Sequence, residues 1–393
     1  MENTYRTLTV DKKENLYAVA DGVTGMKIVF VNVYFVKGSE GPGGNWVLVD
    51  AGLYGSAQRI KKVAEEKFGK DARPSAIILT HGHFDHVGAL KELALEWNVP
   101  IYAHHLEIPY LTGLSAYPPP DPSVGGGAMA YMSFMYPKKP INVGGMVQLL
   151  PQDGSVPGLP EWRWYHTPGH SPGHVSFFRE RDRTLIAGDA VVTRKPESAL
   201  AVLTDAPEVC GPPAYFTPDW PAARKSVQDI TALRPNVIAS GHGVPMHGER
   251  MRDELDELSK YFDQMAVPTH GRYVNHPAVM DEQGVVSVPE KVSTPATKAL
   301  ITAGLIAAAG LAAYAISKRR NNHQKKNSAE GPLDNYPYYG EEMNLSVYGE
   351  IPEVENNELL RRNGPQQPEN VSQRYPGNRD YISNSNAPSN EYP

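Results

Sequence analysis

The stretch ILTHGHFDH, residues 78–86, decides how this chain is interpreted. His81 and His83 are two residues apart, so in an extended backbone they point to the same side and can share one cation. Asp85 and His86 stand where a helix is expected to begin, and the change of backbone geometry turns them toward a neighbouring position. Imidazole and carboxylate together suit zinc, iron or manganese. The segment therefore predicts a metal-binding loop rather than a plain polar loop with Asp85 as a helix cap.

Four more ligand-type side chains each stand just after a predicted strand. His170 lies in TPGHSPGH, Asp189 ends LIAGD, His242 lies in SGHG, and Asp50 ends WVLVD. Loops beyond strand ends are where rigid scaffolds present binding and catalytic residues. Each signal is weak alone, but together they predict one site at the edge of a sheet.

Short β-branched runs alternate with amphipathic stretches over residues 1–275, which predicts one α/β domain. The predicted strands are Ile28–Val36, Trp46–Asp50, Ala76–Thr80, Ile101–Ala103, Val147–Leu150, Trp162–His166, Val175–Arg179, Thr184–Ala187 and Val237–Ser240. The predicted helices are Ser56–Phe68, Val87–Glu96, Trp220–Leu233 and Gly248–Met265. The aromatic, Pro- and Gly-rich segment Tyr117–Tyr136 is expected to be a long loop, either a lid over the site or a flap that only covers the scaffold.

In this order, over residues 28–250, the motifs resemble those of the metallo-β-lactamase fold superfamily, and in detail its glyoxalase II-like hydrolases. The resemblance implies an α/β fold built as a four-layer αββα sandwich with two metal ions at one edge. By position it implies a first metal on His81, His83 and His170, a second on Asp85, His86 and His242, Asp189 as the bridge, and Asp50 as a residue that orients the loop.

The chemistry that follows is hydrolysis. Two close cations lower the pKa of a shared water, so that a metal-bound hydroxide is available near pH 7. That hydroxide attacks an ester, thioester or related carbonyl while a metal stabilises the oxyanion. We therefore predict a dinuclear hydrolase of a small molecule, with Asp85 and Asp189 as catalytic carboxylates and zinc, iron or manganese as the metal. Ser171, Ser176 and Cys210 are interpreted as structural, because no side-chain nucleophile is required.

Two other functions stay open. Superfamily relatives use a similar ligand set to hold one iron and oxidise persulfides. Alternatively, the chain is a membrane-anchored interaction protein that acts through its C-terminal tail, although the tail carries no recognisable ligand motif. Tyr215 and Phe216, in PPAYFTPD, are candidates for the substrate pocket. His174 is interpreted either as a hydrogen-bonding partner behind the ligands or as a core histidine, and the remaining histidines are not assigned to metal.

Composition excludes two other classes of protein. The 393 residues carry 38 Lys+Arg against 44 Asp+Glu, a net charge of −6, without the basic excess of a nucleic-acid-binding protein. One cysteine, Cys210, rules out an internal disulfide framework.

The C-terminal third differs from the rest. Residues 276–298 are predicted as a linker, and the uncharged residues 299–317 as a single apolar helix about 28 Å long that anchors the chain in a membrane. Gly304, Ala308 and Ala312 form a small-residue ridge on which two such helices could pair in a homo-oligomer. Residues 318–393, rich in Asn, Pro, Tyr, Ser and Glu, are predicted as a disordered tail. The cluster of Lys and Arg that follows the segment, residues 318–326, would by the positive-inside tendency place that side in the cytosol and the hydrolase outside. Since no secretory signal is recognised at the N-terminus, the catalytic domain is instead expected on the cytoplasmic face.

Overall fold

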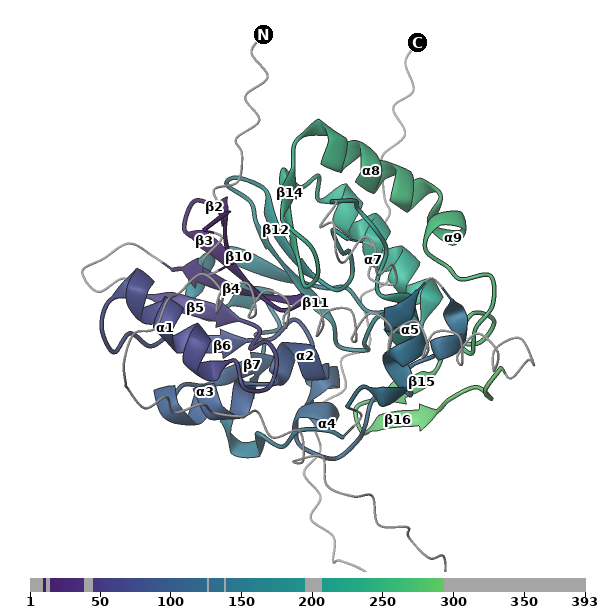
Figure 1. Ribbon diagram of the computed structural model, residues 1–393, viewed down its shortest axis with the longest axis horizontal. Coiled ribbons are helices and arrows are strands. Elements are labelled where there is room, and N and C mark those ends of the chain that lie inside the picture. Colours follow the sequence, from purple (N-terminus) through teal and green to yellow (C-terminus); the bar gives the residue numbers. More distant parts are fainter. Residues whose placement is uncertain are drawn as a thin grey trace, which may run out of the picture. The chain divides into compact units, whose positions relative to one another are not determined.

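Two β-sheets form the centre of the computed structural model, which describes residues 10–11, 15–38, 45–125, 127–137, 139–194 and 207–292 (Figure 1). The first sheet has eight strands in the order β1 to β8: Val10–Asp11, Leu16–Ala20, Val23–Ile28, Val31–Lys37, Trp46–Val49, Ala76–Ile78, Ile101–Ala103 and Val147–Leu149. The second has the order β14-β13-β12-β11-β10-β9: Met246–His247, Val237–Ser240, Thr184–Gly188, Val175–Arg179, Leu159–His166 and Ser155–Val156.

Strand direction brings several strand ends to a common edge in each sheet. In the first sheet, β5 to β8 pair in parallel. In the second, β10 and β12 are both antiparallel to β11, and β12 is parallel to β13, so β10, β12 and β13 run the same way. Side chains that follow these strands therefore emerge at the same edge of their sheet.

Side chains alternate between the two faces of each central strand, as the period of two requires. On β5, Trp46 and Leu48 join the cluster that the outer helices cover, whereas Val47 and Val49 join the cluster between the two sheets. All four are buried, so this strand is apolar throughout. Strands buried on both faces read as continuous hydrophobic runs, and this explains the WVLV pattern.

Helices cover the outer face of each sheet. Helices α1 (Ala57–Phe68) and α3 (Leu90–Trp97) pack on the first sheet, and α7 (Trp220–Ala232) and α8 (Glu249–Lys260) pack on the second (Figure 1). Three hydrophobic clusters thus lie between four successive layers: helices, sheet, sheet and helices. The mixed α/β architecture agrees with the layering expected from the sequence.

Most predicted strands are found at the predicted positions. Ile101–Ala103, Val175–Arg179 and Val237–Ser240 are confirmed to the residue as β7, β11 and β13. The prediction of one strand over Ile28–Val36 was wrong. The chain turns at Val29, which has a φ of +58° and is exposed, so β3 and β4 form a hairpin there. Because apolar residues continue from Ile28 through Val31, the pattern gave no sign of the turn between the two strands.

Two predicted helices are each divided in the structure. The prediction Val87–Glu96 corresponds to α2 (Phe84–Val87) followed by α3, with the break after Gly88. A Cβ on Gly88 would lie 2.1 Å from the backbone nitrogen of Tyr54, so this glycine allows close packing of two backbone segments. The prediction Gly248–Met265 corresponds to α8 and α9 (Phe262–Met265), which are separated at Tyr261.

Two segments expected to be irregular contain regular structure. Within 117–136, the chain forms η2 (Pro122–Val124), α5 (Ala128–Met132) and η3 (Ser133–Met135). Within the predicted linker 276–298, β15 (Val279–Asp281) and β16 (Gly284–Ser287) form a two-stranded antiparallel sheet. The remaining short elements are η1 (His105–Glu107), α4 (Ile108–Leu111), η4 (Gly144–Met146) and η5 (Ala214–Phe216).

The predicted apolar helix 299–317 and the predicted tail 318–393 lie outside the described residues and stay predictions. Within the described ranges, every helix is too short or too polar to span a bilayer.

Candidate metal centre

The side chains predicted as ligands come together at the strand ends of the two sheets, and all of them are buried. They are His81, His83, Asp85, His86, His170, Asp189 and His242. Four come from the loop after β6 and the short helix α2, and the others come from the loops after β10, β12 and β13. The common direction of these strands explains the convergence.

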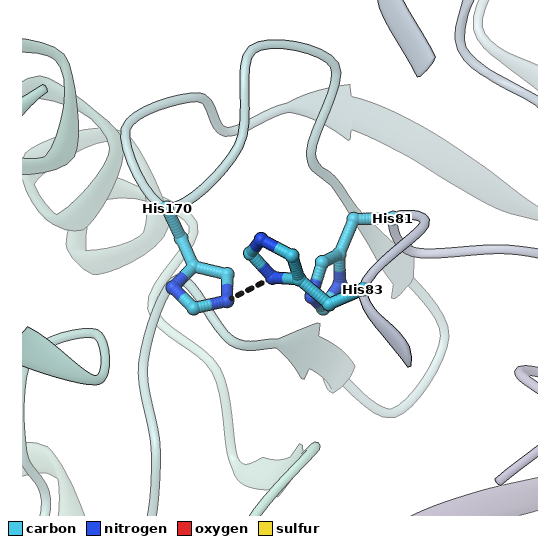
Figure 2. Close-up of side chains that lie close together, drawn as sticks. All are labelled: His81, His83 and His170. Atoms are coloured by element: carbon cyan, nitrogen blue, oxygen red, sulfur yellow. Dashed lines mark hydrogen bonds between the residues drawn. The ribbon is translucent and has the colours of Figure 1, made fainter. Parts of the chain in front are cut away.

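A first group consists of His81, His83 and His170. Each offers one ring nitrogen, and the three nitrogens lie within 4.8 Å of one another. His83 Nδ1 and His170 Nε2 are 2.9 Å apart, and Figure 2 shows the two rings directed toward each other across the gap between their loops. This spacing suits three ligands of one cation.

A second group consists of Asp85, His86 and His242, whose ligand atoms also lie within 4.8 Å of one another. His242 Nε2 is 3.5 Å from Asp85 Oδ2. Asp85 and His86 are neighbours on α2, whereas His242 follows β13 in the other sheet. The second group, like the first, therefore depends on both halves of the fold.

Asp189 lies between the two groups. Its Oδ2 is 3.4 Å from His170 Nε2 and 3.1 Å from His242 Nε2, and its Oδ1 is 3.6 Å from His86 Nε2. A Cβ on Gly241 would lie 2.0 Å from Asp189 Oδ1, so the glycine of the SGHG motif makes room for this carboxylate. The position is suited to a ligand shared by two cations.

Several polar atoms at the centre lack a hydrogen-bond partner among the described residues. They are His81 Nε2, His86 Nε2, His170 Nδ1 and Asp189 Oδ1, and all four are buried. Buried polar atoms in proteins are nearly always satisfied, and a bound ion is one way in which this is achieved. Imidazole nitrogens and carboxylate oxygens suit divalent zinc, iron or manganese. The residues present therefore fit divalent metal ions.

Protein groups hold the other nitrogen of three of these rings. His81 Nδ1 is 3.0 Å from Thr80 Oγ1, His86 Nδ1 is 2.8 Å from Asp50 Oδ2, and His242 Nδ1 is 2.9 Å from the carbonyl oxygen of Phe30. Such contacts fix the orientation of a ligating histidine and leave Nε2 free for the metal.

Asp50 connects strand β5 to the loop that follows β6. Its Oδ1 accepts a hydrogen bond from the Thr80 amide and its Oδ2 accepts one from Thr80 Oγ1, both at 2.8 Å. It has a φ of +61°, a conformation rare for a residue with a side chain. Through these bonds and the contact with His86, Asp50 connects the loop to the end of β5, a position that suits the orienting role that the resemblance implies.

His174 lies behind Asp189. Its Nε2 accepts a 2.8 Å hydrogen bond from the Asp189 amide, and its Nδ1 is 2.9 Å from Thr167 Oγ1. Of the two interpretations left open for this histidine, the contacts agree with the hydrogen-bonding partner.

The candidate histidine ligands differ in the direction in which the protein shifts their pKa. Burial lowers the pKa of His83 to about 3, and burial among other imidazoles likewise lowers the pKa of His81 and His170. These rings are neutral at pH 7, with lone pairs available for a cation. For His242, burial also opposes protonation, but the carboxylates of Asp189 and Asp85 together raise the pKa. Burial alone would raise the pKa of Asp189, yet the charges of His242 and His86 hold it well below its usual range.

Sequence reasoning missed two supporting features. The β3–β4 hairpin places the Phe30 carbonyl against His242, and Asn32 Nδ2 donates to the carbonyl oxygens of Ser240 and Gly243. Glu107, wholly buried, accepts hydrogen bonds from the loops of both His83 and His170. A carboxylate four residues after the parallel strand β7 was the available signal for Glu107, because that strand ends at the same edge as β6.

The two candidate pocket residues differ in position. Phe216 is half-buried and its ring stacks on His83 at 4.8 Å. Tyr215 is buried and contacts Phe216 at 5.0 Å between ring centroids. Tyr136, from the segment 117–136, contacts Phe84 and Phe216. An aromatic cluster thus adjoins the first group.

Known protein families and individual proteins are similar to this chain. The model of the metallo-beta-lactamase superfamily matches residues 26–242. A protein of Bacillus subtilis named probable metallo-hydrolase YflN is 44% identical over 259 residues, which cover 66% of this chain and 98% of the relative. A hydroxyacylglutathione hydrolase, GloC of Haemophilus influenzae, is 28% identical over 147 residues, covering 37% of this chain and 61% of the relative.

Among solved structures, the BLEG-1 B3 metallo-beta-lactamase is similar, with a TM-score of 0.41 and 23% identity. The match covers 59% of this chain and 92% of that protein. With the family model matching more than half of its length, from the hairpin strand β3 to His242, the chain belongs to the metallo-beta-lactamase superfamily.

Proposed function

We propose that this protein is a dinuclear metal-dependent hydrolase that cleaves an ester, thioester or related bond in a small molecule. One observation carries the proposal: two groups of three ligand atoms, each within 4.8 Å, adjoin a carboxylate that contacts members of both. His81, His86 and Asp189 form a further group at the same spacing, which connects the two.

The assignment of ligands follows this division. His81, His83 and His170 would hold one cation, and Asp85, His86 and His242 would hold the other. Asp189 would bridge the two, since one of its oxygens approaches His86 and the other approaches His170.

Two divalent cations bound there would supply an activated water and a Lewis acid for a carbonyl oxygen. The chain's own residues prepare the site for them. Burial keeps His81, His83 and His170 neutral, and Asp50 holds His86 with its Nε2 directed inward. Because every candidate ligand is buried, bulk water reaches the centre poorly and electrostatic interactions there are strengthened.

Two observations bear on the substrate. The rings of Phe216, Tyr136 and Phe84 adjoin the first group and offer an apolar, aromatic surface to part of a substrate. One relative is named a hydroxyacylglutathione hydrolase, and hydroxyacylglutathione is a thioester, which supports including thioesters with apolar acyl groups in the search.

The test combines metal analysis with an activity screen on the full chain. We expect about two zinc, iron or manganese ions per chain and hydrolysis of generic esters or thioesters, with activity lost on chelation and regained on adding metal. His83→Ala and Asp85→Ala should each lower the metal content, because they remove one ligand from different groups. His276→Ala, at an exposed position, is the matched control and should keep both ions.

Two outcomes would contradict the proposal. A chain that binds no metal would remove its basis. A chain with one iron, thiol-dependent oxygen uptake and no hydrolysis would favour the persulfide-oxidising alternative.

A further inference from the structure

Glu107 is a buried carboxylate that accepts four hydrogen bonds. It ends η1, just after β7, and its side chain is inaccessible to solvent. Its Oε1 accepts from Ser171 Oγ and from the Gly173 amide, both at 2.8 Å, and its Oε2 accepts from the Gly82 amide at 2.8 Å and from the Tyr117 hydroxyl. A buried carboxylate is costly unless its oxygens are satisfied in this way.

Three of the four donors belong to the two loops that carry the first group. Gly82 lies between His81 and His83, and Ser171 directly follows His170. One loop follows β6 of the first sheet, whereas the other joins β10 to β11 of the second sheet. Glu107 therefore links, through one carboxylate, the segments whose ring nitrogens meet in Figure 2.

Tyr117 extends this link to the ligand ring itself. Its hydroxyl accepts a 2.9 Å hydrogen bond from the Gly82 amide and donates to Glu107. Its ring lies 4.4 Å from the His83 ring and stacks on Tyr110 at 3.9 Å. The hydroxyl and the carboxylate thus hold the backbone of the loop, while the ring supports His83.

Glu107 and Tyr117 also explain why two positions of the motifs are glycine. A Cβ on Gly173 would lie 2.8 Å from Glu107 Cγ, and a Cβ on Gly82 would lie 2.6 Å from the Tyr117 hydroxyl. The glycine of HGH and the second glycine of TPGHSPGH therefore leave room for Glu107 and Tyr117. The metal hypothesis alone gave these glycines no role.

We propose that Glu107, assisted by Tyr117, is a positioning residue for the first metal: it sets the distance between the His81–His83 loop and the His170 loop, and thereby the affinity of that group for its cation. This inference rests on the proposed dinuclear site. Gly82 lies between His81 and His83, and Ser171 directly follows His170, so the effect is expected at the first of the two metals.

The test measures zinc affinity at each site of the full chain by competition with a chromophoric chelator. Glu107→Gln keeps the size but replaces one acceptor oxygen with a donor that faces N–H groups. We expect about 10- to 100-fold weaker binding at one site, the usual effect of losing a residue that orients ligands. Tyr117→Phe, which keeps the ring, should weaken the same site less. In an Asp85→Ala background, which leaves the first group intact, the remaining zinc should show the same loss.

The matched control is Asp121→Asn. Asp121 is also buried and also joins two segments, accepting hydrogen bonds from Ser123 and from the Arg272 amide, but neither segment carries a proposed ligand. This variant should lose stability without losing zinc affinity. Thermal unfolding with chelator present verifies that each variant is folded, and if Glu107→Gln does not fold, Tyr117→Phe decides.

The outcomes separate this inference from the proposed function. Wild-type protein that binds two zinc ions, with both affinities unchanged in Glu107→Gln and Tyr117→Phe, would overturn the inference and leave the dinuclear site standing. Equal weakening of both sites, or equal weakening in Asp121→Asn, would also overturn it, because general destabilisation would then explain the loss. Wild-type protein that binds no zinc, iron or manganese would overturn the proposed function itself.

Discussion

The two halves of this molecule contribute to the metal centre in different ways. The half built on the first sheet supplies four candidate ligands from one short segment, residues 81–86. The half built on the second sheet supplies His170, Asp189 and His242, each from a separate loop. Both of the three-residue groups take members from both halves.

This difference shows where the geometry comes from. In the first half, local backbone conformation and Asp50 orient the ligands, because the residues are nearly adjacent. In the second half, the parallel pairing of β12 with β13 brings Asp189 close to His242, and contacts with the first half complete the arrangement. Among these contacts, the Val175 amide donates a hydrogen bond to the Thr80 carbonyl oxygen, and His242 Nδ1 is hydrogen-bonded to the Phe30 carbonyl oxygen. The centre therefore depends on how accurately the two sheets are held together.

The strongest test of this comparison removes the ligand that serves both groups. Asp189→Ala should lose both metals and reduce hydrolysis by more than about 100-fold, since even residues that only orient ligands cost about 10- to 100-fold. His83→Ala, in the first group alone, should keep one metal. Metal content and kcat/KM are the measurements, and Asp229→Ala, at an exposed ion pair with Lys225, is the control. If Asp189→Ala kept two ions, the two groups would not share a ligand.

A second prediction separates the contact between the sheets from the contact with the outer helices. Phe177 and Phe178 are neighbours on β11 and equally buried, but Phe177 lies in the cluster between the sheets and Phe178 in the cluster under α7 and α8. Each change to alanine should lower the free energy of unfolding by about 3–5 kcal/mol. Denaturant unfolding with chelator present measures this loss.

The two variants should differ in metal binding. Phe177→Ala loosens the contact that sets the distance between ligands of different sheets, so zinc affinity should fall in the folded protein. Phe178→Ala leaves that contact in place and serves as the matched control. Equal zinc affinities in the two variants would show that the spacing of the sheets does not control the centre.

The same contrast explains what could be predicted from the sequence. The segment 78–86 was recognisable because it holds four ligand-type side chains within six residues. The other candidate ligands were recognisable because each follows an apolar strand. Glu107 and Phe30 could not be found in this way. Glu107 acts through backbone amides that are distant in sequence, and Phe30 acts through its carbonyl group, which every residue possesses. The hairpin at Val29 was missed because apolar residues continue through the turn.

The smallest predicted effect concerns a contact between the halves that lies apart from the candidate ligands. His104, after β7, stacks on His166, at the end of β10, with ring centroids 4.3 Å apart. Burial, together with the charges of His166 and His105, lowers the pKa of His104 to about 3. Folded His104 is therefore neutral in mild acid, while the unfolded chain takes up a proton near pH 6.5. Because the unfolded state then binds more protons, the free energy of unfolding falls as pH decreases from about 6.5 toward 3.

His104→Phe should reduce this dependence, because it keeps an aromatic ring in the stack and removes the titrating group. One histidine contributes at most about 1.4 kcal/mol per pH unit. The unfolded histidine is only partly protonated between pH 7 and 6, so the expected difference over the measured range is about 0.5–1 kcal/mol per pH unit. Urea unfolding of the chelated protein at pH 7, 6 and 5 gives the two slopes, and the contributions of histidines that do not contact His104 cancel in their difference. Identical slopes would mean that His104 takes up a proton in the folded state as readily as in the unfolded state. The loss of stability in acid would then come from other titrating groups.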